Sequence, residues 1–131
     1  SAAWHPSGSF VAVGDYGTEV DDAVLQFWST EGTLIKSQAL EGDGEVRNLA
    51  WTRDGSRLAT ASSYLTIWDR QGERLFTADP GEMLWGVDWS PDGETILTSS
   101  GNGRVDLWSP EGKPIRRILA PTEEIPGSES N

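Results

Sequence analysis

Short apolar runs alternate with turn-forming residues along most of the chain. The middle third reads VRNLAW at 46–51, RLATAS at 57–62, LTIWD at 65–69 and ERLFTA at 73–78. The same order of runs and turns returns between residues 84 and 119. Short β-prone runs separated by Gly, Pro, Asp and Asn predict an antiparallel meander of short strands. No segment sustains a helical period, so we expect almost no helix.

Tryptophan marks an internal repeat with a period near 40 residues. One phrase, apolar–Trp–polar–Gly, occurs as LQFWSTEG, LTIWDRQG and VDLWSPEG, and its tryptophans are 40 residues apart. A second phrase, Trp–x–x–(Asp or Ser)–Gly, occurs as WHPSG, WTRDG and WSPDG. Six of the seven tryptophans therefore hold repeat positions: Trp4, Trp28, Trp51, Trp68, Trp89 and Trp108. Only Trp85 lies outside the repeat.

Four short strands in about 40 residues match one blade of a β-propeller. The chain resembles the WD-repeat (WD40-type) β-propeller family, because LTIWD matches the family's blade-ending phrase and WSPDG and WTRDG match its first turn. The resemblance implies an all-β fold of propeller blades, each a four-stranded antiparallel meander. We expect three blades at about 1–40, 41–79 and 80–120, and a disordered acidic tail at 121–131. In such blades the indoles would fill the wedge between neighbouring sheets.

The chain departs from the family pattern in two places. The family's Gly–His pair before the first strand is replaced by EGDGE at 41–45 and DPGEM at 79–83. The family's Asp between the second and third strands is also missing, since Ser63–Tyr64 and Asn102–Gly103 stand there. We therefore expect the family's Asp–His–Ser/Thr–Trp hydrogen-bond network to be incomplete.

Three blades do not close a propeller, which needs four to eight. The chain also starts inside a first strand, at SAAW. Three interpretations follow. The chain is a piece of a larger propeller, or two copies close a six-bladed ring, or the blades form an open array with exposed strand edges.

Charge and composition exclude several classes of function. The net charge is −11, with 10 Lys and Arg against 21 Asp and Glu. This sign disfavours nucleic acid and anionic membrane surfaces as partners. There is no cysteine and one histidine, His5, so neither a zinc–thiolate site nor a catalytic dyad can be assembled. We expect no enzymatic activity, no cofactor and a cytoplasmic location.

The stretch GDYGTEVDDA at 14–23 is an insertion in the first unit. Its acidic side chains, which are a weak candidate calcium site, are Asp15, Glu19, Asp21 and Asp22. The stretch lacks the spacing of an EF-hand loop, so a plain surface loop is the leading interpretation, ahead of a partner-contact loop. If it contacts a partner, Tyr16 would be the anchor.

Trp85 breaks the repeat, and Arg47 holds the equivalent position in the second unit. The resemblance places this position, with Met83 and Tyr64, on the face where the family's partners usually bind. An exposed Trp–Met pair is a typical binding hot spot, although burial between blades is an equal alternative for Trp85. The candidate partner-binding residues are Tyr16, Arg47, Tyr64, Met83 and Trp85.

The sequence therefore favours a non-catalytic protein–protein interaction or scaffold module within a WD-repeat propeller. The alternative is a sensor or autoinhibitory propeller segment of a larger signalling ATPase or kinase. Beyond a protein partner, we expect the module to contact other propeller blades, from its parent chain or from a second copy.

Overall fold

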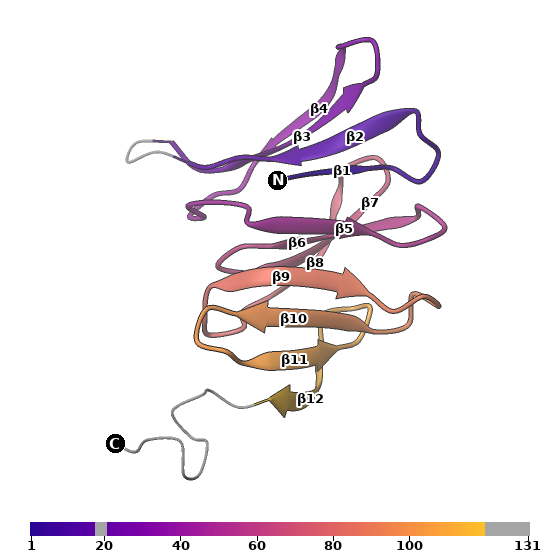
Figure 1. Ribbon diagram of the computed structural model, residues 1–131. Helices are drawn as coiled ribbons and strands as arrows, with labels where there is room; N and C mark the ends of the chain where they lie inside the picture. The colour runs from indigo at the N-terminus through magenta and orange to yellow at the C-terminus, as the bar shows by residue number, and fades with distance from the viewer. Residues whose placement is uncertain (18–20, 120–131) are drawn as a thin grey trace.

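The structure, a computed structural model, describes residues 1–17 and 21–119. These residues form twelve strands and contain no helix, so none that could cross a membrane (Figure 1). The strands are β1 (Ala2–Trp4), β2 (Phe10–Gly14), β3 (Val24–Ser29), β4 (Leu34–Ala39), β5 (Asn48–Trp51), β6 (Arg57–Ala61), β7 (Leu65–Asp69), β8 (Arg74–Ala78), β9 (Leu84–Trp89), β10 (Ile96–Ser100), β11 (Val105–Trp108) and β12 (Pro114–Leu119). The tail predicted at 121–131 lies outside the described residues.

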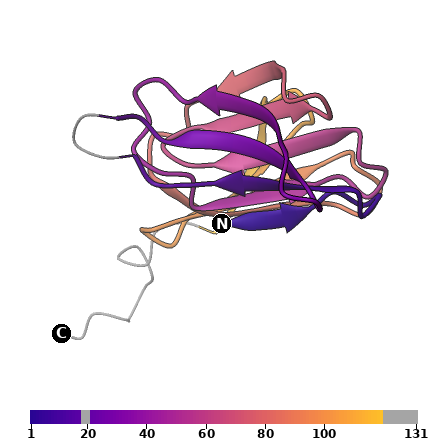
Figure 2. The ribbon, with the colours of Figure 1, turned by 90° about the horizontal axis from the view of Figure 1, so that it is seen from above.

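The strands form three antiparallel meanders, which we call sheet 1 (β1–β4), sheet 2 (β5–β8) and sheet 3 (β9–β12). The sheets follow one another in chain order, as Figure 1 shows from top to bottom. Their first strands are the innermost, because β1 packs beside β5 and β5 beside β9. The fold is therefore all-β, an arc of three propeller blades, and Figure 2 shows the sheets overlying one another when seen from above.

The strand predicted at 46–51 is shorter in the structure, where β5 covers only Asn48–Trp51. It starts at Asn48, because the amide of Val46 donates to the carbonyl of Asp15 in the insertion of sheet 1. The insertion therefore takes up backbone groups that would otherwise extend β5. This contact ties the first unit to the second at the end of β5 where Arg47 lies.

Two apolar clusters hold the three sheets together. Between sheets 1 and 2 the main residues are Phe10, Leu25, Phe27, Leu49, Leu58 and Trp68. Between sheets 2 and 3 they are Ala59, Leu65, Ile67, Val87, Trp89, Ile96 and Trp108. Successive side chains of a strand point to opposite faces, so Leu58 packs on sheet 1 while its neighbour Ala59 packs towards sheet 3. Sheet 2 is thus buried on both faces.

His5 locks the first turn of sheet 1 against the first turn of sheet 2. The ring is buried and stacks on Phe10 with centroids 4.4 Å apart. Its Nε2 lies 2.9 Å from the carbonyl oxygen of Gly55, and its Nδ1 lies 2.8 Å from the hydroxyl of Ser7. Both ring nitrogens are engaged, so the single histidine has a structural role between the blades.

The indole N–H groups of the 40-residue phrase all find acceptors. Trp68 donates to the hydroxyl of Thr60 at 3.0 Å, and Trp108 donates to Thr98 at 2.8 Å. In sheet 1 the position equivalent to Thr60 is Val13, and Trp28 donates instead to the Gln26 side chain at 3.0 Å. The Trp–Thr part of the family network is therefore present in sheets 2 and 3, although its Gly–His pair is missing.

Candidate functional site

Arg47 and Trp85 meet at one end of the innermost strands. Arg47 precedes β5 and Trp85 is the second residue of β9. The guanidinium carbon of Arg47 lies 4.4 Å from the centre of the Trp85 ring, which is a cation–π contact. Glu45 accepts a hydrogen bond from the terminal nitrogen of Arg47 at 3.0 Å. The Nε of Arg47 is buried without a hydrogen-bond partner in the described part of the chain, so the stack and Glu45 hold the side chain in place.

Tyr16 lies beside this pair and completes a shallow pocket of about 240 Å³. Its backbone pairs with Glu45 in an isolated antiparallel bridge. Tyr16 is 75% exposed and Trp85 is 57% exposed, so Trp85 is not buried between blades. The remaining lining comes from Ser1, Gly14, Asp15, Glu45, Val46 and Arg47. We call this pocket and its rim the Trp85 surface.

The other two candidate residues lie apart from this pocket. Tyr64 lines a separate hollow of about 160 Å³, together with Asp43, Thr66 and Arg74. Met83 is half-buried, and its carbonyl accepts a hydrogen bond from the amide of Gly101. The structure therefore brings three of the five predicted binding residues to one pocket and leaves Tyr64 and Met83 outside its lining.

Sequence reasoning missed Glu45 as a member of this surface. A signal for it was present, because Glu45 and Arg47 are two residues apart in an extended segment and so project to the same side. The sequence predicted Asp15 as a weak candidate metal ligand and as part of a possible partner-contact loop. It lines the pocket, and its carboxylate accepts the amide of Val24 at 2.7 Å.

The weak calcium candidate is only partly described. Glu19 lies outside the described residues. Asp15 and Asp22 direct carboxylate oxygens at the backbone amides of Val24 and Gly42. Within residues 1–17 and 21–119, no three side chains of metal-binding type come together. These contacts close the insertion onto its own backbone and onto the segment that follows β4.

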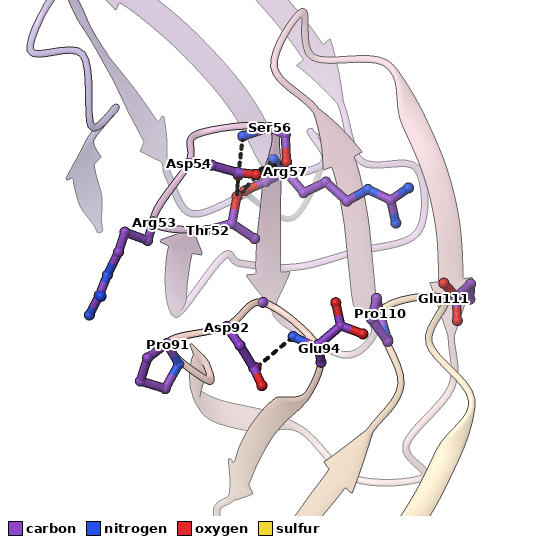
Figure 3. A pocket seen from close by; sticks show the side chains of 11 residues that line it. Thr52, Arg53, Asp54, Ser56, Arg57, Pro91, Asp92, Glu94, Pro110 and Glu111 are labelled. Atoms are coloured by element: carbon purple, nitrogen blue, oxygen red, sulfur yellow. Dashed lines mark hydrogen bonds between the residues drawn. The ribbon is translucent and has the colours of Figure 1, made fainter.

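A larger cleft of about 470 Å³ lies at the opposite end of the inner strands (Figure 3). It is formed by the turns of sheets 2 and 3, and two of its carboxylates, those of Asp54 and Asp92, accept hydrogen bonds from their own turns. Asp54 accepts hydrogen bonds from Ser56 and Thr52, which lower its pKa to about 2. The Ser90 hydroxyl and the Glu94 amide likewise lower the pKa of Asp92. These carboxylates stay ionised near neutral pH and stabilise turns, so they suit neither proton transfer nor general base chemistry.

Comparison with known proteins agrees with this architecture. The profile of the WD40 family (WD domain, G-beta repeat) matches residues 32–71 and 72–109. The chain belongs to this family. Each matched stretch begins before the last strand of one sheet and ends after the third strand of the next. The family's sequence unit is therefore offset by one strand from the structural sheet.

Individual relatives are longer than this chain. It is 33% identical over 104 residues to protein transport protein sec13 of Aspergillus fumigatus, an alignment that covers 66% of this chain and 33% of that protein. It is 31% identical over 130 residues to WD repeat-containing protein 1 of Gallus gallus, covering 92% of this chain and 20% of that protein. The chain thus spans a third or less of these relatives. The solved structure of U3-55K superposes with a TM-score of 0.79 at 18% identity, over 91% of this chain and 38% of that one.

Proposed function

We propose that this chain is a non-catalytic protein-interaction module of a WD-repeat propeller, and that it binds a protein partner through the Trp85 surface. The observation that carries the proposal is the exposed indole of Trp85, held in place by the Arg47 guanidinium. Tryptophan, tyrosine and arginine are the residues most enriched in binding hot spots. All three types meet at this pocket.

The scaffold behind the surface supports the same proposal. Arg47 and Trp85 sit on the ends of strands that are packed in the core, while Tyr16 is fixed by its bridge to Glu45. Side chains held in this way lose little conformational entropy when a partner binds.

The relatives favour a scaffold over an enzyme. Sec13 of Aspergillus fumigatus is named as a protein transport protein, and the Gallus gallus relative is named for its WD repeats. Neither name refers to a chemical reaction. We expect this chain to share with these proteins the propeller fold, which presents a binding surface to a partner. A cytoplasmic location is part of the proposal, since a chain without cysteine is compatible with a reducing compartment.

The test compares Trp85→Ala with Ile35→Ala. Ile35 is 56% exposed on β4, so the two changes remove similar exposed apolar side chains at different places. Proteins that bind the immobilised wild-type chain are identified by mass spectrometry, and the affinity of each purified candidate is measured by calorimetry. We expect Trp85→Ala to weaken binding by about thirtyfold, which is the effect of a hot spot worth about 2 kcal/mol.

Ile35→Ala should leave the affinity unchanged, and circular dichroism should show that both variants keep the β fold. A partner that binds all three proteins equally well would contradict the assignment of the Trp85 surface. A partner lost in both variants would point to a different surface.

A further inference from the structure

The Trp85 surface lies on a strongly acidic edge of the molecule. In each meander the loop after the second strand and the loop that leads to the next sheet lie at the same end of the strands. Across the sheets these loops meet, since the amide of Leu84 donates to the carbonyl of Ser62. We call this end the acidic edge, and it consists of residues 15–17, 21–23, 40–47, 62–64, 79–83 and 101–104. Its described acidic side chains are Asp15, Asp21, Asp22, Glu41, Asp43, Glu45, Asp79 and Glu82.

The described basic residues of the acidic edge are Arg47 and Arg104, and neither presents a free cation. Arg47 is engaged by Glu45 and by the ring of Trp85. Arg104 is buried, and its guanidinium donates to the carbonyl of Pro80. A negatively charged partner would therefore be repelled from this edge, whereas a positively charged partner would be attracted to it.

The opposite edge has a more even charge. It is formed by the turns at residues 5–9, 30–33, 52–56, 70–73, 90–95 and 109–113. Its acidic residues are Glu31, Asp54, Glu73, Asp92, Glu94 and Glu111, and its basic residues are Arg53, Arg70 and Lys113. The negative charge of the described chain is thus concentrated at the edge that carries Trp85.

The hollow beside Trp85 has a size that suits a single side chain. Its volume of about 240 Å³ falls below the roughly 300 to 1,000 Å³ of typical small-molecule sites. Asp15, Tyr16 and Glu45 line it together with Trp85. Aromatic rings and carboxylates attract the charged head of an Arg or Lys side chain, through cation–π contact and charge-assisted hydrogen bonds.

Neighbouring residues hold the Trp85 ring and still leave more than half of it exposed. A Cβ on Gly101 would lie 2.6 Å from the indole Nε1, so the ring packs closely on this glycine. Arg47 stacks on the ring, and Glu45 offsets the charge of Arg47. The side chain of Trp85 therefore keeps its position, and its exposed part is available to a second cation.

We infer that the Trp85 surface binds a basic segment of its protein partner, with an Arg or Lys side chain of that segment seated between Trp85 and Tyr16. This inference rests on the proposed function, because it names the chemistry of the partner for the same surface. The carboxylates of Asp15 and Glu45 pair with the charged head, and the other acidic residues of the edge attract the rest of the segment.

The first test uses an array of synthetic peptides of random sequence, probed with the labelled full chain and with its Trp85→Ala variant. Peptides that need Trp85 for binding should be enriched in Arg and Lys. The affinity of the best peptide is then measured by fluorescence anisotropy. Replacing its Arg residues by citrulline, an uncharged analogue of similar shape, should weaken binding by at least about tenfold. Added salt should weaken it as well, because salt screens exposed charges.

Amide variants of the chain locate the charge that the peptide meets. Asp15→Asn and Glu45→Gln keep an oxygen acceptor for the amide of Val24 and for Arg47, but they remove the negative charge. Each should raise the dissociation constant of the selected peptide by about three- to tenfold. Glu111→Gln removes a charge from the opposite edge and should leave the constant within about twofold of the wild type. Circular dichroism should show that all three variants keep the β fold.

Three outcomes would contradict these expectations in different ways. Selected peptides that need Trp85 but are acidic or uncharged would overturn the inference and leave the proposed function standing. If no peptide needed Trp85, both the inference and the proposed function would be contradicted. Equal losses for Glu45→Gln and Glu111→Gln would show that the net charge of −11 attracts the peptide without a defined site, and would overturn the placement of the cation at Trp85.

Discussion

At the scale of single residues, the turn glycines of the Trp–x–x–(Asp or Ser)–Gly phrase are equal in backbone conformation but not in surroundings. Gly8 and Gly55 have φ angles of +73° and +74°. A Cβ on Gly8 would meet nothing within 4 Å, whereas a Cβ on Gly55 would lie 2.5 Å from Nε2 of His5. Gly8→Ala should therefore cost only the strain of the left-handed conformation, about 1 kcal/mol of unfolding free energy.

Gly55→Ala should cost about 2 to 3 kcal/mol, because it adds the displacement of His5 to the same strain. Urea unfolding measures both values. The excess should shrink when His5→Ala is combined with Gly55→Ala, since the colliding ring is then absent. Equal losses for Gly8→Ala and Gly55→Ala would show that His5 does not hold the two turns together.

At the scale of elements, sheets 2 and 3 each anchor their third strand to their second through an indole. The bond from Trp68 to Thr60 is buried, and so is that from Trp108 to Thr98. Thr60→Val keeps the shape of the side chain but leaves a buried indole N–H without an acceptor. We expect a loss of about 1 to 3 kcal/mol of unfolding free energy. Thr98→Val should behave in the same way.

Thr77→Val is a suitable control, because Thr77 is an exposed position on β8 with the same change of side chain. It should alter the stability by less than about 0.5 kcal/mol. If Thr60→Val lowered the unfolding free energy no more than Thr77→Val, then the packing of the Trp68 ring, and not its hydrogen bond, would account for its contribution to stability. Sheet 1 already tolerates a valine at this position, but only because Gln26 supplies the acceptor.

At the scale of the whole molecule, stability should fall from the middle of the arc to its outer strands. β6 and β7 are buried on both faces, whereas every residue of β12 is exposed. Repeat proteins gain stability from interfaces between neighbours, and sheet 2 has two such interfaces. Amides of β6 and β7 should exchange with deuterium most slowly, and those of β12 should exchange first. Uniform exchange across the sheets would contradict this order.

The repeat explains how much of this molecule could be predicted from sequence. The tryptophan spacing predicts four strands in each unit, and the equivalent positions of Arg47 and Trp85 in consecutive units place them side by side. Tyr16 could not be placed in this way, because the insertion that carries it has no counterpart in the other units. The exposure of Trp4 could not be predicted from the repeat either, because the burial of a repeat position depends on whether a neighbouring sheet covers it and not on the residue itself.

The offset between the sequence unit and the sheet has a consequence for how such chains lengthen. A stretch of 40 residues contains four strands wherever its boundaries fall, provided that the period is kept. Duplicating a stretch that runs from the end of β3 to the end of β7 adds the last strand of one sheet and three strands of the next, and every sheet still has four strands. Gene duplication therefore need not respect sheet boundaries, and a blade can be gained or lost with breakpoints at many positions along the unit.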